Sequence, residues 1–562
     1  MNQSAISCAS QGALSECIIN ASKGSNTVTF MSGETADKLT WAELHRAALS
    51  LAVSLNKQGF RHGDRIALLG NTSKDFVTAM QATWLIGATV VVLPLPFRLS
   101  SMDQFKSDSI DRVNDAEVAG VIVDRTLAAF IQPKELKKQT GAKLILLSEL
   151  ASENRDIAKF KKPNYQPDDL AILQFTSGST SAPKGVMLSN SNICANLDAI
   201  STGANTNRTS DVIVSWLPLY HDMGLIGCLV NSMANGLDLV IGAPNDFLSS
   251  PLRWMMWISD FSGTATAGPN FSYALAARAL KKSKVILDLS KLRIALNGAE
   301  PVDPKTVANF VEAGARHGLR PEAVFPAFGM AEVCIAGAFP EPMTGLRTDK
   351  ISTKLFEEQG LASLADSEEF SEFAILGGPV EGLEFRIQDP QSGDVLAERK
   401  VGELQIRGTS LTTGYFKKEK ETAASFIDGW FKTGDLAYLT DGELVLCGRI
   451  KDLIIIGGRN IYPQDIEKVV GEIPDVRTGN VIAFGTKANI KESIVVVAET
   501  KIKSGFAELV TQIKSSVLAT VGVPASTVTL VSPSSLPKTS SGKLQRAKCK
   551  ASFESGSLTS LN

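Results

Sequence analysis

The chain has 562 residues, of which 44% are hydrophobic, and 57 basic against 59 acidic residues give a net charge of −2. This length predicts a large body and at least one further domain, and the absence of a basic excess argues against nucleic acid as a general partner. Seven cysteines without a CxxC pair and only four histidines argue against a disulfide framework and a Cys/His zinc site.

The N-terminal residues, MNQSAISCAS, contain no basic segment followed by an apolar run, so no secretory signal is expected. The most hydrophobic stretch, Trp84–Leu95, contains Gly87 and ends in a Pro-rich turn. It is too short to cross a bilayer and is interpreted as a buried strand with the helix that leads into it. We therefore expect a cytoplasmic protein without a transmembrane segment.

Helices and strands alternate through the first half of the chain. Helical spacing of apolar residues predicts helices at 41–55 and near 74–86, and short apolar runs predict strands at 65–69, 89–93, 121–123, 144–146 and 212–214. Such alternation is typical of an α/β fold, in which helices cover parallel sheets.

The pattern changes near residue 380. Short strands bounded by turns, at 385–387, 402–406 and 443–446, predict a small β-rich subdomain over about 378–450. Beyond residue 450 the chain is interpreted as a separate α+β domain, 451–562. Its predicted elements are helices near 464–471 and 505–519 and strands at 480–484, 493–499 and 527–531, and the polar tail from Ser552 is expected to fray.

A loop rich in small hydroxyl residues is the most informative segment. An apolar strand runs into Thr176-Ser177-Gly178-Ser179-Thr180-Ser181-Ala182-Pro183-Lys184-Gly185, and a second strand follows. Successive backbone N–H groups in such a loop form an anion site, and the lysine adds a positive charge for phosphate. The loop is not a Walker A motif, because no Gly-Lys-Ser/Thr precedes a helix. A merely flexible Gly/Ser turn is disfavoured by five Ser/Thr residues before Pro-Lys-Gly.

This loop resembles the signature loop of the adenylate-forming superfamily, which includes acyl-CoA synthetases, peptide-synthetase adenylation domains and luciferases. Five further segments resemble the superfamily's motifs in the same order, over about residues 40–547. They are Asn297-Gly298-Ala299-Glu300-Pro301, Phe328-Gly329-Met330-Ala331-Glu332, Trp430–Asp435, Gly448–Asp452 and Pro537–Lys543. The resemblance implies the fold of these enzymes: a large N-terminal body, here 1–450, and a mobile C-terminal domain.

The resemblance also implies a reaction, in which a carboxylate attacks the α-phosphorus of ATP and pyrophosphate leaves. Because two anions must meet, the site needs positive charge and a metal. Glu332 and Thr176 are expected to hold Mg²⁺, a hard cation that suits oxygen ligands. Lys543 is expected to be the catalytic lysine that bridges the substrate carboxylate and the α-phosphate, and His221 is expected near the acyl carboxylate.

The remaining motif residues are expected to bind the nucleotide. Asn297, Gly298, Ala299 and Glu300 would line the adenine, together with Gly329, Met330 and Ala331. Phe328 would stack on the adenine where the superfamily more often has Tyr, which loses a hydroxyl but keeps the stacking face. Asp435 would accept hydrogen bonds from the ribose hydroxyls, and Arg449 would assist at the ribose or phosphate. Lys451 occupies the position of the interdomain hinge.

The class of acid is inferred from segments that resemble one subfamily of these enzymes. The segments Met223–Ile226 and Thr266–Phe271 are candidates for an apolar acyl groove, and Tyr220-His221-Asp222-Met223-Gly224 resembles fatty acyl-AMP ligases. The resemblance therefore implies a fatty acid, medium or long in chain, as substrate.

An insertion near 348–373 supports the same subfamily. Forty-four residues separate Glu332 from Gly377, whereas acyl-CoA ligases cross this interval with a shorter stretch. The extra material resembles the insertion with which fatty acyl-AMP ligases restrain their C-terminal domain. Such a restraint favours an acyl carrier protein, or a synthase carrier domain, over CoA as the acceptor. Three alternatives stay open: a surface loop without function, a fatty acyl-CoA ligase, and a non-catalytic adenylate-binding homologue.

Overall fold

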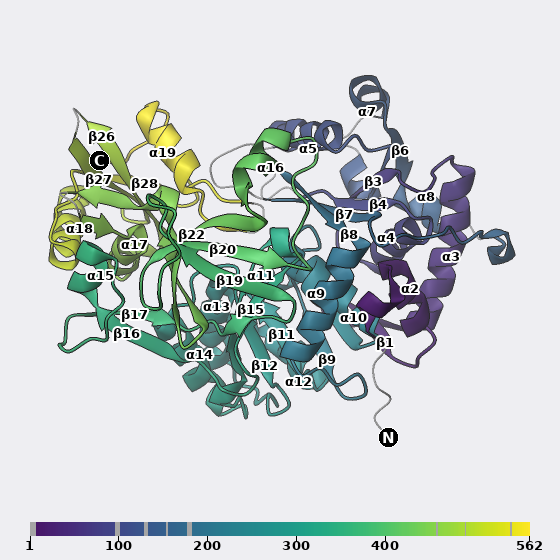
Figure 1. Ribbon diagram of the computed structural model, residues 1–562, viewed down its shortest axis with the longest axis horizontal. Coiled ribbons are helices and arrows are strands. Elements are labelled where there is room, and N and C mark those ends of the chain that lie inside the picture. Colours follow the sequence, from purple (N-terminus) through teal and green to yellow (C-terminus); the bar gives the residue numbers. More distant parts are fainter. Residues whose placement is uncertain are drawn as a thin grey trace.

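The structure is a computed structural model that describes residues 7–95, 102–128, 133–152, 155–176, 183–456, 459–488, 491–539 and 542–562. Two large sheets and their helices form the body, and the smaller C-terminal domain lies at one side of it (Figure 1). Within the described residues, no helix is both long enough and apolar enough to cross a membrane.

The first large sheet has six strands in the order β6-β5-β3-β4-β7-β8. All neighbours are parallel except β7 and β8. Their bounds are β3 Arg65–Leu69, β4 Thr89–Val92, β5 Gly120–Val123, β6 Lys143–Leu146, β7 Leu170–Phe175 and β8 Gly185–Ser189. The helices in this part of the chain are α3 Trp41–Lys57, α4 Lys74–Leu85, α5 Met102–Asp115, α6 Arg125–Ala128, α7 Pro133–Thr140 and α8 Leu147–Ser152.

The second large sheet has seven strands in the order β13-β12-β11-β9-β10-β1-β2, and only β1 and β2 are antiparallel neighbours. Its strands are β1 Thr27–Ser32, β2 Thr35–Thr40, β9 Val212–Ser215, β10 Asp238–Ile241, β11 Ala265–Gly268, β12 Ile294–Asn297 and β13 Val324–Pro326. The α-helices of this layer are α1 Cys8–Gln11, α2 Leu14–Ala21, α9 Asn190–Gly203, α10 Asn231–Asn235, α11 Pro244–Ser249, α12 Leu252–Asp260, α13 Asn270–Lys282 and α14 Pro304–Ala315.

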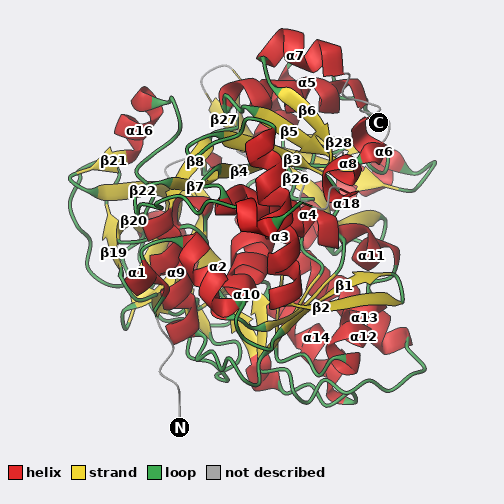
Figure 2. Cartoon of the chain, turned by 90° about the vertical axis from the view of Figure 1, so that its right-hand side faces the viewer, coloured by secondary structure: helices red, strands yellow, loops and turns green. Residues whose placement is uncertain are grey.

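Helices and both large sheets bury one shared core, and Figure 2 shows α3 and α4 lying against the strands. Ile66 and Ile172 from the six-stranded sheet belong to the same buried cluster as Val214 and Val240 from the seven-stranded sheet. Helix α3 begins at a capping box, because the Thr40 hydroxyl accepts from the Glu43 N–H while the Glu43 carboxylate accepts from the Thr40 N–H.

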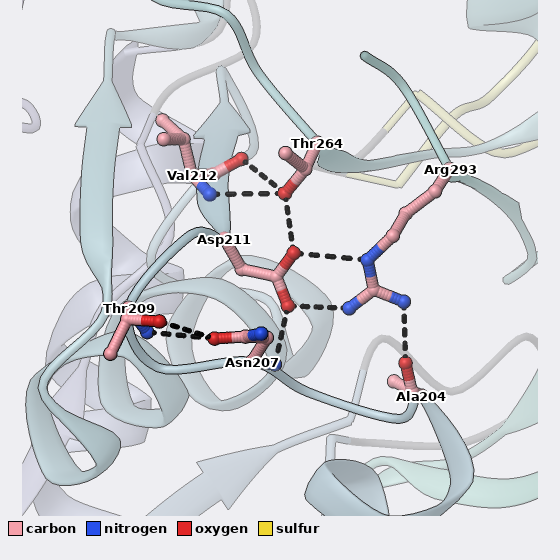
Figure 3. A network of polar contacts seen from close by, with 7 residues as sticks. All are labelled: Ala204, Asn207, Thr209, Asp211, Val212, Thr264 and Arg293. Carbon is pink, nitrogen blue, oxygen red and sulfur yellow. Dashed lines mark hydrogen bonds and ion pairs between the residues drawn. The ribbon is translucent and has the colours of Figure 1, made fainter. Parts of the chain in front are cut away.

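The amino ends of three neighbouring strands of the seven-stranded sheet are tied together by one ion pair. Asp211 precedes β9, Thr264 precedes β11 and Arg293 precedes β12, and all three side chains meet (Figure 3). Arg293 donates to both carboxylate oxygens of Asp211, at 2.9 and 2.5 Å, and to the Ala204 carbonyl at 2.7 Å. This network stabilises the amino ends of these strands. The opposite, carboxyl ends remain for a binding site.

The β-rich subdomain contains a five-stranded and a three-stranded antiparallel sheet. The five-stranded sheet comprises β19 Leu383–Gln388, β20 Gly402–Gly408, β21 Phe426–Ile427, β22 Trp430–Thr440 and β23 Glu443–Arg449, with α16 Glu419–Ser425 before β21. The three-stranded sheet comprises β14 Phe328–Gly329, β15 Ala336–Phe339 and β18 Gly378–Pro379. The insertion folds as a two-stranded hairpin around one helix: β16 Thr348–Ser352, α15 Thr353–Gln359 and β17 Phe370–Ala374.

The C-terminal part has a core of its own. Strands β26 Val476–Ala488, β27 Lys491–Thr500 and β28 Thr527–Val531 form a mixed sheet, preceded by the hairpin β24 Ile454–Ile456 and β25 Arg459–Ile461. Helices α17 Pro463–Gly471 and α18 Phe506–Val521 pack on this sheet, and α19 Arg546–Glu554 follows it. The buried cluster that joins these elements consists of residues between Ile454 and Leu530.

Most predicted elements are confirmed, including the strand at 65–69 and the helix that begins at Trp41. The prediction of a frayed tail is wrong. The Leu561 N–H donates to the Leu530 carbonyl at 2.8 Å, and the Asn562 side chain bonds to both Val528 and Leu530. Polar tail residues can replace a missing neighbouring strand, because the exposed edge of β28 offers unpaired backbone groups.

Candidate active site

A large cleft, about 3180 Å³ in volume, opens between the body and the C-terminal domain. In parallel sheets, ligands bind beyond the carboxyl ends of the strands. The cleft follows that rule, since Thr176 follows β7, His221 lies in the loop after β9, Glu300 follows β12 and Phe328 follows β13. The two sheets meet here through a hydrogen bond of 2.9 Å from the Gln174 amide to the Tyr220 carbonyl.

The two described ends of the predicted phosphate loop, Thr176 and Lys184, lie at the carboxyl ends of these strands. They are closed by a hydrogen bond of 3.0 Å from the Thr176 N–H to the Lys184 carbonyl, and both residues line the cleft. Lys184 places its ammonium group 4.5 Å from the centre of the Tyr415 ring. The predicted loop residues Ser177, Gly178, Ser179 and Thr180 lie outside the described residues.

Residues 412–416, here called the 412–416 strap, join the phosphate loop to Glu332. On one side the Met187 N–H donates to the Gly414 carbonyl at 3.1 Å, and the Phe416 N–H donates to the Gly185 carbonyl at 2.8 Å. On the other side the Thr412 N–H donates to the Glu332 carbonyl at 2.7 Å. The strap therefore sets the position of β8 relative to the loop that carries Glu332.

Glu332 is buried in the cleft wall. Its carboxylate Oε1 accepts a hydrogen bond of 2.9 Å from the Tyr415 hydroxyl. Burial raises the pKa of Glu332, and the negative charge of Asp222 raises it further, whereas the Tyr415 hydrogen bond lowers it. Tyr415 is a site residue that the motif-based reasoning missed, because it lies 83 residues from Glu332 in the chain.

Two predicted adenine segments form neighbouring parts of the wall. Gly298, Ala299 and Glu300 line the cleft beside Phe328 and Met330. Asn297 lies just beneath, fully buried, with its amide 3.2 Å from the Asn270 side-chain oxygen.

The segment Phe328–Glu332 requires glycine at position 329. A Cβ atom at this residue would lie 1.9 Å from the Ile335 carbonyl oxygen, so only glycine fits the tight turn between β14 and β15. The Phe328 ring is 93% buried, and it meets the Phe385 ring edge-on with 6.4 Å between ring centres.

His221 and Asp222 lie just before a helix that borders the cleft. Asp222 precedes the π-helix Met223–Val230 and accepts from the Met223 N–H at 2.8 Å, and its Oδ1 lies 2.7 Å from His221 Nδ1. Burial alone would raise the pKa of Asp222, but His221, Lys543 and the Met223 N–H outweigh it and lower that pKa. π-Helical turns are rare, and they occur frequently at functional sites.

The predicted ribose residue Asp435 and Arg449 lie on adjacent strands, and the predicted hinge residue Lys451 follows β23 in the short 3-10 helix Ile450–Asp452. Asp435 on β22 is paired in register with Arg449 on β23, and Arg449 Nε lies 2.9 Å from Asp435 Oδ1. Burial raises the pKa of Asp435, and Arg449 and Lys451 oppose this rise. Burial lowers the pKa of Lys451, and the positive charge of Arg449 lowers it further.

Lys543 reaches the cleft from the C-terminal domain. Its backbone is held by Thr539, whose N–H donates to the Lys543 carbonyl at 2.8 Å and whose hydroxyl accepts from the Lys543 N–H at 3.1 Å. Burial lowers the pKa of the Lys543 ammonium, and the charges of Asp222 and Glu300 oppose the shift. Lys543 is half-buried and lines the same cleft as both carboxylates.

The insertion contacts the C-terminal domain directly. The Phe356 ring of α15 stacks on the Tyr462 ring with 4.6 Å between centres, and Glu357 of the same helix forms an ion pair with Arg459. Phe356 is fully buried in a cluster that also contains Tyr438 of the β-rich subdomain. The insertion thus bridges the two parts of the chain.

Comparison with known proteins agrees with this arrangement. The family model described as "AMP-binding enzyme" matches residues 20–416, and the model "Disco-interacting protein 2-like, AMP domain" matches residues 451–562. The chain belongs to the AMP-binding enzyme family. Two segments thus match separately, and the stretch between them, 417–450, contains the strands that carry Asp435 and Arg449.

Several relatives of this AMP-binding enzyme match along nearly their whole length. Rv1013 of Mycobacterium tuberculosis is 38% identical over 90% of this chain and 93% of that protein. "Medium-chain-fatty-acid--[acyl-carrier-protein] ligase JamA" of Moorena producens is 32% identical over 93% of this chain and 91% of JamA. A structure from "Structural and Functional Studies of Fatty Acyl-Adenylate Ligases from E. coli and L. pneumophila" superposes with a TM-score of 0.91 at 31% identity, covering 98% of this chain and 99% of that one. These matches confirm the predicted adenylate-forming fold.

Proposed function

We propose that this AMP-binding enzyme is a ligase that uses ATP to convert a medium- or long-chain fatty acid to its acyl-adenylate and then transfers the acyl group to an acyl carrier protein or synthase carrier domain. The position of Lys543 is the observation that carries the proposal. A lysine of the C-terminal domain lines the same cleft as Asp222 and Glu300, beyond the carboxyl ends of the strands of both large sheets. JamA, a ligase named for both the acid and the carrier, supports the choice of substrate and acceptor.

In this proposal the nucleotide lies along the wall formed by two loops and two strands. The adenine packs against Phe328 and the Gly298–Glu300 backbone, and the ribose hydroxyls donate to Asp435, which Arg449 orients from the adjacent strand. The phosphates lie at the loop between β7 and β8, near Lys184. Thr176 would supply its hydroxyl, and Ser177 through Thr180 would supply backbone N–H groups and hydroxyls for them.

Lys543 would bridge the acid carboxylate and the α-phosphate, where negative charge accumulates as the carboxylate oxygen attacks phosphorus. Burial lowers the pKa of Lys543, and an electrostatic contact in a partly buried cleft is stronger than in water. His221 borders the same space and would orient the carboxylate.

The residues present fit a magnesium ion held mainly by phosphates. The described part of the chain contains no group of three His, Cys, Asp or Glu side chains arranged to bind a metal. Mg²⁺ commonly takes one or two protein oxygens and completes its shell with phosphates and water. Glu332 and Thr176 would supply those oxygens, and the bound ion would neutralise phosphate charge.

The acceptor is proposed from the insertion. Because α15 contacts Tyr462 and Arg459, it opposes rotation of the C-terminal domain about Lys451. A carrier domain, which docks on the protein surface, can offset that restraint better than free CoA.

All seven cysteines are free thiols, which fits the reducing cytoplasm that we propose as the site of action.

Product analysis by mass spectrometry tests the proposal. The purified protein is given ATP, Mg²⁺ and fatty acids of increasing chain length, with CoA and a holo acyl carrier protein in parallel reactions. Acyl-AMP in both reactions, followed by transfer to the carrier protein alone, is the expected result. Rapid formation of acyl-CoA would favour the acyl-CoA ligase alternative, and the absence of any adenylate would exclude both ligase readings.

A further inference from the structure

The loop after α13 exposes two adjacent aliphatic side chains. Val285 and Ile286 are each 63% exposed. Single exposed hydrophobic residues are common on proteins, but a neighbouring pair of large side chains at the tip of a loop points to an interaction surface.

The tip is anchored from both sides, so its exposure is built into the fold. Leu287 and Leu289 are buried directly behind it, and their N–H groups donate to His317 Nδ1 at 3.0 Å and to the His317 carbonyl at 2.7 Å. In front of the tip, the Ser283 hydroxyl donates to the Val285 carbonyl at 2.9 Å. The two aliphatic side chains therefore point outward because the buried leucines use the inward positions.

Exposed cations surround the tip. Lys282 and Lys284 are exposed beside it, and Arg278 and Lys281 precede them on α13. Lys281 pairs with Glu312 of α14 at 2.7 Å, and Asp288, just beyond the tip, accepts from Ser290. Among the described residues, Arg278, Lys282 and Lys284 have no acidic partner within ion-pair distance. We call Arg278, Lys281, Lys282, Lys284, Val285 and Ile286 the 278–286 patch; its four cations contrast with a chain whose net charge is −2.

The same helix leads from the patch to the active site. The residues of α13 that line the cleft include Phe271 and Leu275 near the site, and Arg278 and Lys281 towards the patch. Their spacing of three, four and seven residues places them on one face of the helix. The cleft wall is thus apolar next to the site and cationic where it reaches the protein surface.

We propose that the 278–286 patch docks the enzyme on an anionic lipid surface, from which a membrane-dissolved acid reaches the cleft along α13. Paired aliphatic tips that enter the headgroup region, flanked by lysines that meet anionic lipids, are the two contributions that hold peripheral proteins on membranes. A patch of six residues is small for a stable protein–protein interface, which commonly uses about 20–30 residues a side. The delivery step rests on the proposed function, whereas docking does not.

Vesicle co-sedimentation of the full-length protein tests the docking. Vesicles of phosphatidylcholine alone are compared with vesicles that also contain phosphatidylglycerol, without ATP or fatty acid. Two double variants are used: Val285→Ser/Ile286→Ser and Lys282→Glu/Lys284→Glu. Matched controls alter exposed residues elsewhere, Val395→Ser for the apolar pair and Lys57→Glu/Lys161→Glu for the charges.

Wild type and controls are expected to bind the anionic vesicles, and each patch variant is expected to lose roughly tenfold or more in partition coefficient. Failure of the wild type to bind, or equal binding by the patch variants, would overturn the docking proposal. Patch variants that bind vesicles normally but fail to acylate a carrier protein would overturn it in favour of a protein partner. Acid-dependent ATP–pyrophosphate exchange with a dissolved medium-chain acid, without vesicles, is measured in parallel. It should be unchanged in the patch variants, which shows that they are folded and separates failure of docking from failure of the proposed function.

Discussion

The Tyr415 hydroxyl donates a hydrogen bond of 2.9 Å to the carboxylate of Glu332, and the same tyrosine ring lies under the Lys184 ammonium group. One side chain thus contacts both the proposed metal ligand and the lysine at the end of the phosphate loop. Tyr415 is held in turn by the 412–416 strap, which bonds to β8 on one side and to the Glu332 backbone on the other.

Tyr415→Phe is expected to reduce ATP–pyrophosphate exchange roughly tenfold to hundredfold at limiting Mg²⁺, and less at saturating Mg²⁺. A hydrogen bond to a charged group contributes about 1.5–3 kcal/mol, and without it the carboxylate is less well positioned. Exchange rates are measured across a Mg²⁺ titration, and binding of ATP without metal is measured by calorimetry as a second readout. Tyr438→Phe is the matched control, because the Tyr438 hydroxyl donates to Asp349 at 2.8 Å outside the cleft. An equal change in Mg²⁺ requirement in both variants would show that Tyr415 has only a structural role.

Arg459→Gln is expected to raise the ratio of acyl-CoA to acyl-carrier product severalfold. The variant breaks the ion pair with Glu357 and weakens the contact between the insertion and the C-terminal domain. Products are quantified by mass spectrometry with CoA and carrier protein in competition. Arg477→Gln, which breaks an ion pair with Glu499 inside the C-terminal domain, is the control and should leave the ratio unchanged. A wild-type product ratio in Arg459→Gln would contradict the proposal that the insertion restrains the C-terminal domain.

Asp465→Asn is expected to change the pH dependence of stability. Burial and the charge of Glu357 raise the pKa of Asp465 from 3.8 to about 7 in the folded protein. Ionisation is therefore costly in the folded state, so wild-type stability from this group is present at low pH and falls as pH rises from about 4 to about 7. Tm is measured by calorimetry across this range. The Tm of the variant should exceed that of the wild type by a margin that increases towards neutral pH. The exposed Asp475→Asn serves as control, and parallel curves for all three proteins would contradict the prediction.

Arg293→Met is expected to lower the free energy of unfolding by about 3–5 kcal/mol, because Asp211 would remain as an uncompensated buried charge. The network in Figure 3 lies at the amino ends of the strands, away from the cleft. The rate of exchange by the folded fraction at low temperature should therefore be retained. Denaturant titration measures the loss, and Arg347→Met, which breaks a more exposed pair with Glu443, should cost less than about 1 kcal/mol. A similar loss in both variants would contradict a special role for the network.

Most of the elements that the sequence predicted are present in the structure, because they follow from local patterns of apolar residues. Ile66–Leu69 of the predicted strand at 65–69 is an apolar run, and Thr176 follows directly on the apolar strand β7. The strands β12 and β13, which precede Glu300 and Phe328, were not among the predicted elements. Contacts between distant segments were not predictable in the same way. Nothing local places Tyr415 beside Glu332, since the contact depends on how the β-rich subdomain folds back onto β8.

The tail shows the same difference between composition and tertiary structure. Its polar residues indicate fraying, yet Asn562 bonds to the open edge of β28. The length of the insertion indicated that it had a role, but not that Phe356 would stack on Tyr462. The choice of partner residue depends on three-dimensional packing that one sequence does not reveal.

Fatty-acid-dependent ATP–pyrophosphate exchange in Lys543→Ala is the most direct test of the account. Lys543 is proposed to neutralise the charge that builds up as the acid attacks ATP, so its removal should reduce exchange by at least about a hundredfold. Binding of ATP, measured by calorimetry, should persist, and Lys550→Ala, a change on the exposed surface of α19, should leave exchange at the wild-type level. Wild-type exchange in Lys543→Ala would contradict the proposed mechanism.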